Sequence, residues 1–124
     1  MDISKMSSLG YTHVHFAFAN ITSSFQVDVS GVQSQFNGLK QLTGIKRIIS
    51  FGGWAFSTSP DSAPIFRQGV TAAQRTTFIN NVVSFINNNN LDGVDFDWEY
   101  PGVCFLSSIY ILYYLDLCVA NVQF

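Results

Sequence analysis

The stretch that decides the fold is L-D-G-V-D-F-D-W-E-Y-P at residues 91–101. Successive side chains of a β-strand point to opposite faces, so an extended conformation separates this stretch into two rows. The apolar row is Val94, Phe96 and Trp98, and the acidic row is Asp95, Asp97 and Glu99. The apolar row is large enough to be covered by helices, which predicts a half-buried strand whose acidic row lies on the inner face.

The acidic row has three interpretations. Neighbouring members stand about 6–7 Å apart along a strand, so their charges repel and one of them is expected to hold a proton near neutral pH. A protonated acid beside ionised carboxylates is the arrangement that glycoside hydrolysis requires. A solvated strand face and a site for a hard cation are the alternatives, although such a site usually draws oxygen ligands from turning loops.

Outward from this stretch, strand-like and helical patterns alternate. Strands are predicted over 11–20, 46–51 and 91–100, with a weak helix over 32–39 and a clearer one that follows Thr71. Thr71 and Gln74 have the spacing of a capping box, residues 21–31 form a polar turn-prone stretch, and four asparagines at 87–90 indicate a polar helix exit. The alternation predicts an α/β fold with a parallel sheet, whose ligands bind at the carboxyl ends of the strands.

Length and composition exclude several classes of protein. A chain of 124 residues is too short for a complete (β/α)8 barrel, which needs about 250 residues. A hydrophobic content of 48% excludes disorder, and a charged content of 11% with a net charge of −2 argues against a nucleic-acid partner. Cys104 and Cys118 cannot support a disulfide framework, and no signal peptide is visible in the first residues.

Two motifs in order carry a specific resemblance. D-G-V-D-F-D-W-E at 92–99 resembles the DxxDxDxE signature of family 18 glycoside hydrolases, the chitinases, and S-F-G-G-W at 50–54 resembles their SxGG motif. Residues 11–22 and 52–60 resemble fungal-type class V chitinases and killer-toxin α-subunits. The resemblance covers about residues 5–102. It implies that residues 1–102 are a partial (β/α)8 TIM barrel catalytic domain, with strands two to four and their helices.

The resemblance assigns a role to each acid of the signature. Glu99 falls on the proton donor, and Asp97 on the residue that orients the 2-acetamido group, whose carbonyl oxygen attacks the anomeric carbon to give an oxazolinium intermediate. Asp95 falls on the inner acid that shares a proton with its neighbour, and Asp92 on a structural position at the strand entrance. This is a substrate-assisted, retaining mechanism that needs no cofactor.

Five further positions are candidates for the sugar site. Ser50 is expected to donate a hydrogen bond toward the acidic row. Tyr100 is expected to line the sugar site, and Trp54 is either a sugar platform or a core residue. Gly52 and Gly53 allow a close backbone approach or form a simple tight exit from the strand.

His13 and His15 share one strand face, which suggests a metal pair. Strand histidines without a third ligand are more often core residues, so we expect core positions and no metal site.

Residues 103–124 depart from the family pattern. Seventeen of these 22 residues are apolar, and Asp116 carries their only charge. A membrane span is one interpretation, but the acid and the absence of flanking Lys or Arg argue against it. We favour a retained intron, because the Val103-Cys104 codons can read GTATGT, a splice-donor sequence. Sequencing the transcript across this junction tests the hypothesis.

The sequence predicts a chitinase-type hydrolase that acts on β-1,4-linked N-acetylglucosamine in chitin or chito-oligosaccharides, with extracellular localisation by resemblance. By the same resemblance, the first barrel strand and strands five to eight are missing, so the chain alone is expected to be inactive. A lectin-like carbohydrate-binding protein and an inert truncated product are the alternatives. The presence of Glu99 favours the enzyme over the lectin, because lectin-like relatives usually lose the acid.

Overall fold

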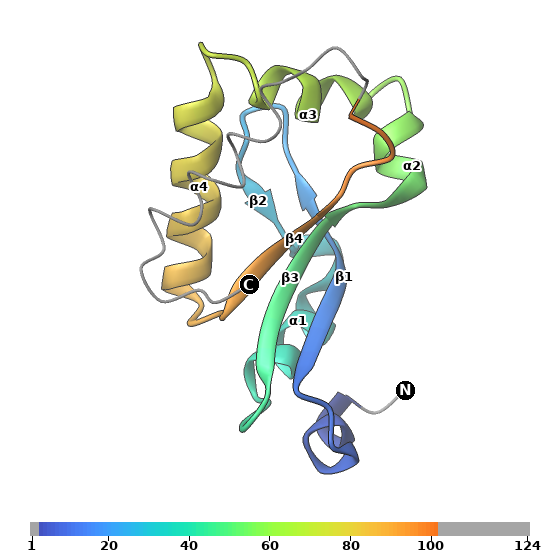
Figure 1. Ribbon diagram of the computed structural model, residues 1–124, viewed down its shortest axis with the longest axis vertical. Coiled ribbons are helices and arrows are strands. Elements are labelled where there is room, and N and C mark those ends of the chain that lie inside the picture. Colours follow the sequence, from blue (N-terminus) through green and yellow to red (C-terminus); the bar gives the residue numbers. More distant parts are fainter. Residues whose placement is uncertain (1–2, 102–124) are drawn as a thin grey trace.

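The computed structural model describes residues 3–101 and contains one four-stranded sheet with helices packed on it (Figure 1). The strands are β1 (His13–Ile21), β2 (Val27–Asp28), β3 (Lys46–Gly52) and β4 (Gly93–Asp97). The helices are η1 (Ile3–Leu9), η2 (Ser30–Val32), α1 (Gln33–Lys40), α2 (Gly53–Thr58), α3 (Ala63–Gly69) and α4 (Arg75–Asn88), of which η1 and η2 are 3₁₀ helices.

The strand order is β2-β1-β3-β4, with β1, β3 and β4 parallel. The predicted strand–helix–strand alternation is therefore confirmed, and the carboxyl ends of the three parallel strands lie at one edge. The motif over 91–101 forms a shorter strand than predicted, because β4 ends at Asp97 and Glu99 lies beyond it. The predicted partial barrel is confirmed as a mixed α/β arrangement.

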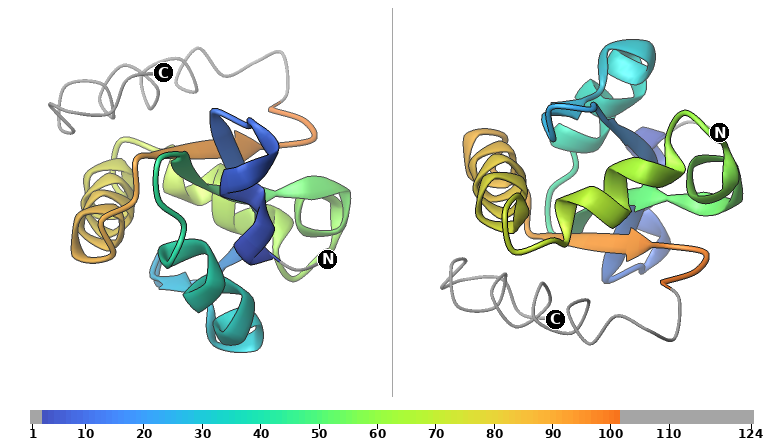
Figure 2. Two further views of the ribbon diagram at one scale, coloured as in Figure 1. Left: turned by 90° about the horizontal axis from the view of Figure 1, so that it is seen from below. Right: turned by 90° about the horizontal axis from the view of Figure 1, so that it is seen from above.

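One face of the sheet forms the hydrophobic core against α1, α3 and α4, which lie on the same side of the sheet (Figure 2). Phe96 lies in an aromatic cluster, with its ring centroid 5.6 Å from that of Phe51, 6.0 Å from Phe66 and 5.8 Å from Phe78. Trp98 packs on Phe66 at 5.4 Å. The apolar row of the strand therefore faces the helices, as predicted, and the acidic row lies on the opposite face.

Two local predictions are wrong. The stretch over 21–31 is not only a polar turn, because β2 pairs antiparallel with the end of β1 and Phe25 is buried in the core. Thr71 does not cap α4, since its hydroxyl donates to the Gln68 carbonyl oxygen and the helix begins at Arg75. The short Thr71 side chain binds the preceding turn instead of the free amides of the next helix.

The polar helix exit is confirmed at the end of α4. The Asn89 side-chain amide donates to the Phe85 carbonyl oxygen at 2.9 Å, and Asn90 adopts a positive φ of 52°. Asparagine tolerates this left-handed conformation better than most residues, so the tract stops the helix and turns the chain into β4.

The prediction for residues 103–124 lies outside the described residues. Within residues 3–101, no helix has the length and apolar character needed to cross a membrane.

Candidate active site

The candidate site lies on the inner sheet face at the carboxyl ends of β3 and β4. Ser50 pairs directly with Asp95 in the register of these two strands, and its Oγ donates to Asp95 Oδ2 at 2.9 Å. Ser50 is buried, at 1% exposure, whereas the Asp95 side chain is 41% exposed. The hydrogen bond expected between Ser50 and the acidic row is therefore present, and it fixes one carboxylate oxygen of a partly solvated acid.

A second polar group reaches the same oxygen from β1, which lies on the other side of β3 from β4. His15 of β1 places its Nδ1 3.3 Å from Asp95 Oδ2, with a side chain that is 53% exposed. His13 is exposed as well, and its Nδ1 lies 2.9 Å from the Thr12 hydroxyl. The core interpretation of the two histidines is wrong, because both side chains are exposed and no helix of residues 3–101 covers the inner sheet face that carries them.

Asp97 and Glu99 continue the acidic row at the end of β4, and both are partly exposed. Ser57 of α2, which the sequence did not single out, connects this segment to the helix after the SxGG motif. Its hydroxyl accepts the Glu99 backbone N–H at 2.9 Å and lies 3.5 Å from the Asp97 carbonyl oxygen. Ser57 is 4% exposed, so this buried hydroxyl fixes the backbone that carries Glu99.

Two glycines lie where β3 ends and α2 begins, and Gly52 permits a close approach between backbones. Gly52 has φ 113° and Gly53 has φ 75°. A Cβ on Gly52 would overlap the backbone carbonyl oxygen of Asp97, and one on Gly53 would meet the Phe18 ring at 2.9 Å. Gly52 is therefore more than a simple strand exit, because only glycine lets β3 approach the end of β4 in this conformation, and Gly53 leaves room for the Phe18 ring.

Two aromatic side chains are exposed at the same edge. Trp54, the second residue of α2, is 64% exposed, and Tyr100 is 71% exposed. The core interpretation of Trp54 is therefore wrong. Exposed aromatic rings near a carboxylate row provide flat apolar faces of the kind on which a sugar ring can stack.

Asp92 lies at the opposite end of β4, away from the acidic row. Its carboxylate accepts from the Arg47 backbone N–H at 2.9 Å, from Arg47 Nε at 3.3 Å and from Lys46 Nζ at 3.3 Å. Burial of this carboxyl disfavours its charged form, but the hydrogen bonds from Arg47 and Lys46 outweigh that cost and lower its pKa. These contacts connect the start of β3 to the residue before β4, which suits a structural role, and we call them the Asp92 clasp.

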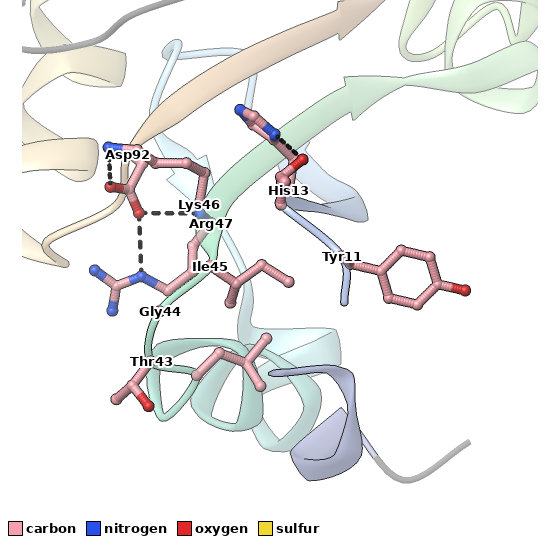
Figure 3. A pocket seen from close by; sticks show the side chains of 10 residues that line it. Tyr11, His13, Thr43, Gly44, Ile45, Lys46, Arg47 and Asp92 are labelled. Atoms are coloured by element: carbon pink, nitrogen blue, oxygen red, sulfur yellow. Dashed lines mark hydrogen bonds and ion pairs between the residues drawn. The ribbon is translucent and has the colours of Figure 1, made fainter. Parts of the chain in front are cut away.

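An open hollow lies beside this clasp, at the amino ends of the strands (Figure 3). Tyr11, His13, Lys46, Arg47 and Asp92 are among its lining residues. The hollow is remote from the acidic row along β4, and its acid is already paired with its two bases. Chemistry at the acidic row therefore does not use it.

Removing the Asp92 clasp is expected to destabilise the fold in a pH-dependent way. Asp92→Ala should lower the free energy of unfolding at neutral pH by about 1.5–3 kcal/mol, the typical worth of a hydrogen bond to a charged group. Because the folded state lowers the pKa of Asp92, this stabilisation is present above the ordinary carboxyl pKa and is lost as pH falls through the lower folded value.

Urea unfolding of the parent chain and the variant, in steps from neutral pH into the acid range, measures this effect. The difference in free energy of unfolding between the parent chain and Asp92→Ala should become smaller in acid. Asp92→Asn, which keeps an acceptor but not the charge, should have a stability between those of the parent chain and Asp92→Ala. A difference in free energy of unfolding that stays constant with pH would contradict the ionic role of Asp92.

Within residues 3–101, no group of three or more His, Cys, Asp or Glu side chains is arranged to hold a metal ion.

Comparison with known proteins shows which protein family the chain resembles. The family model described as glycosyl hydrolases family 18 matches residues 3–112. The chain is 46% identical over 106 residues to "Probable chitinase LysM18" of Penicillium expansum, covering 82% of this chain and 7% of that protein. It is 47% identical over 103 residues to "Killer toxin subunits alpha/beta" of Kluyveromyces lactis, covering 82% and 9%. The chain thus spans less than a tenth of either relative.

A solved structure matches the fold. The chitinase-like agglutinin RobpsCRA of Robinia pseudoacacia superposes with a TM-score of 0.76 at 23% identity, over 97% of this chain and 38% of that one. At this identity the match concerns the fold alone.

Proposed function

The chain belongs to family 18 of the glycosyl hydrolases, and on that basis we propose that it carries the proton-donating half of a chitinase-type active site. The observation that carries the proposal is the hydrogen bond from buried Ser50 to Asp95, which joins the two family motifs on neighbouring strands. In the complete protein, the substrate would be a β-1,4-linked N-acetylglucosamine polymer. The site of action would be extracellular, in line with the name of a relative, "Secreted chitinase LysM12" of Penicillium expansum, which is 45% identical over 102 residues.

The roles proposed for the acids follow their order along the inner face. Glu99 protonates the glycosidic oxygen, and Asp97 orients the 2-acetamido group so that its carbonyl oxygen attacks the anomeric carbon. The C–O bond to the leaving sugar breaks as the oxazolinium ring closes, and the proton from Glu99 goes to the leaving oxygen. Water then opens the ring, with Glu99 accepting a proton from that water. Asp95, held by Ser50, supports Asp97 by sharing a proton with it.

The residues around the acids have supporting roles in this proposal. Gly52 and Gly53 allow α2 to begin beside the end of β4, which brings the Ser57 hydroxyl to the Glu99 backbone. Trp54 and Tyr100 provide exposed rings for the sugar. Ser50 is too buried to form a broad sugar contact, so its contribution is to orient Asp95.

A chimaera tests the function. In this chimaera, residues 3–101 replace the matching segment of "Probable chitinase LysM18" of Penicillium expansum. The experiment measures the release of a fluorescent leaving group from a chito-oligosaccharide. Turnover by the chimaera supports the proposal, and a folded chimaera without turnover would contradict it. The 124-residue chain alone should give no turnover, because residues 3–101 form a sheet of only four strands and each positioned group from the other strands of a barrel typically contributes about 10²-fold or more to rate.

A non-catalytic carbohydrate-binding function is the second candidate. The exposure of Trp54 and Tyr100 favours it, because these rings are available to a sugar whether or not proton transfer occurs. A related fold also occurs in a protein described as an agglutinin. A folded chimaera that binds chito-oligosaccharides in calorimetry but does not cleave them would favour this function over hydrolysis.

A further inference from the structure

His15 makes a contact that the roles above do not use. Its Nδ1 lies 3.3 Å from Asp95 Oδ2, although 80 positions separate the two residues in the sequence. In the sheet, His15 pairs with Ile48 of β3, and Ile48 pairs with Gly93 of β4. The His15 side chain therefore crosses the central strand diagonally to reach an acid two residues further along β4.

The direction of this hydrogen bond depends on which ring nitrogen of His15 carries the hydrogen. A carboxylate oxygen without a proton can only accept, so a bond to Asp95 Oδ2 requires the hydrogen on Nδ1. Ser50 donates to the same oxygen at 2.9 Å. Within residues 3–101, the hydrogen bonds of the Asp95 carboxylate all end on Oδ2. Two donors on one oxygen hold the carboxylate in a single orientation and leave Oδ1 available to the rest of the acidic row.

We propose that His15 is a positioning residue for Asp95, which its Nδ1–H and the Ser50 hydroxyl hold through Oδ2 so that Oδ1 serves Asp97. This inference rests on the proposed function, since the proton that Asp95 shares with Asp97 belongs to that mechanism. Among the described residues, Asp95 is the carboxylate within ion-pair distance of His15. Strand β3 lies between the two residues, and its side chains Ile48 and Ser50 on this face carry no charge.

His13 is a matched control within the same strand. It lies two positions before His15, so its side chain leaves the same face, and it too is exposed. Its Nδ1 lies 2.9 Å from the Thr12 hydroxyl instead of a carboxylate. These are the two histidines of the chain, so their signals are readily separated.

The first experiment measures the tautomer of each histidine in the 124-residue chain by ¹⁵N chemical shifts of the ring nitrogens. In the neutral state, His15 should carry its hydrogen on Nδ1, and Asp95→Ala should abolish that preference. The His13 shifts should not respond to Asp95→Ala. A neutral His15 with its hydrogen on Nε2 would overturn the proposal, as would a His15 tautomer that is indifferent to Asp95.

The second experiment uses the chimaera and separates positioning from packing. His15→Ala should lower kcat about tenfold, the worth of one hydrogen bond to a charged group, with KM nearly unchanged. His15→Asn should recover most of the lost kcat, because its amide can donate from the position of Nδ1. His13→Ala should leave kcat unchanged.

An unchanged kcat in His15→Ala, or a His15→Asn variant as slow as His15→Ala, would overturn the proposal. Absence of turnover in the parent chimaera would instead count against the proposed function, while the tautomer measurement still decides whether His15 holds Asp95. The two failures are therefore distinguishable.

Discussion

Glu99→Gln in the chimaera is expected to lower kcat by about 10³-fold, within the range that general acid catalysis contributes. Glutamine keeps the shape of the side chain but cannot donate the proton that the leaving oxygen requires. The backbone at this position is fixed by the buried Ser57 hydroxyl, which accepts the Glu99 N–H at 2.9 Å. The substitution should therefore leave the local structure intact, so that chito-oligosaccharide affinity in calorimetry changes little.

Asp92→Asn is the matched control for this prediction. It makes the same exchange of carboxylate for amide in the same motif, but at the opposite end of β4, where the carboxyl contacts Arg47 and Lys46. It should retain most of the turnover and lose stability instead. A Glu99→Gln variant with kcat within about tenfold of the parent would contradict the assignment of Glu99 as the acid.

Gly52→Ala is expected to lower the free energy of unfolding by about 3 kcal/mol or more, the combined cost of a glycine-only conformation and an overpacked contact. Gly52 has φ 113°, and its added Cβ would collide with the backbone carbonyl oxygen of Asp97 and lie 3.3 Å from the Phe66 ring. A backbone oxygen cannot move aside as the end of a flexible side chain can. The collision should push β3 and β4 apart at the candidate site.

Gly44→Ala separates the two contributions. Gly44 also has a positive φ, of 70°, but a Cβ there would meet nothing within 4 Å. It should cost only about 1–2 kcal/mol for the left-handed conformation. Urea unfolding of both variants measures the difference. Equal losses for the two glycines would show that the close approach to Asp97 is not what requires glycine at position 52.

Much of the fold followed from local patterns. The alternation along residues 91–101 predicted which side chains face the helices, and the structure confirms this through the Phe96 and Trp98 contacts. The helix exit at the asparagine tract was also predictable, because its physical cause lies within a few residues. Patterns of this kind depend on the strand and helix periods, which the sequence displays directly.

Other features depended on partners remote in the chain. Thr71 had a capping spacing, but its hydroxyl found a nearer carbonyl oxygen. The two-residue strand β2 shows no period of its own and exists because the end of β1 pairs with it. Trp54 could be read as core or as surface until the end of β3 and the start of α2 were known.

For the candidate site, the sequence by itself determined the acids, their order along and just beyond one strand, and the glycine pair near them. Spacing along one chain segment is enough for that, because a strand repeats every two residues. The hydrogen bond from Ser50 to the acidic row was expected, but only the tertiary structure decided that it ends on Asp95 Oδ2. The tertiary structure alone also brought His15 to that oxygen and Ser57 to the Glu99 backbone. Those contacts join residues 42 to 80 positions apart. Their existence depends on strand order, register and a close backbone approach, and a linear pattern contains none of these.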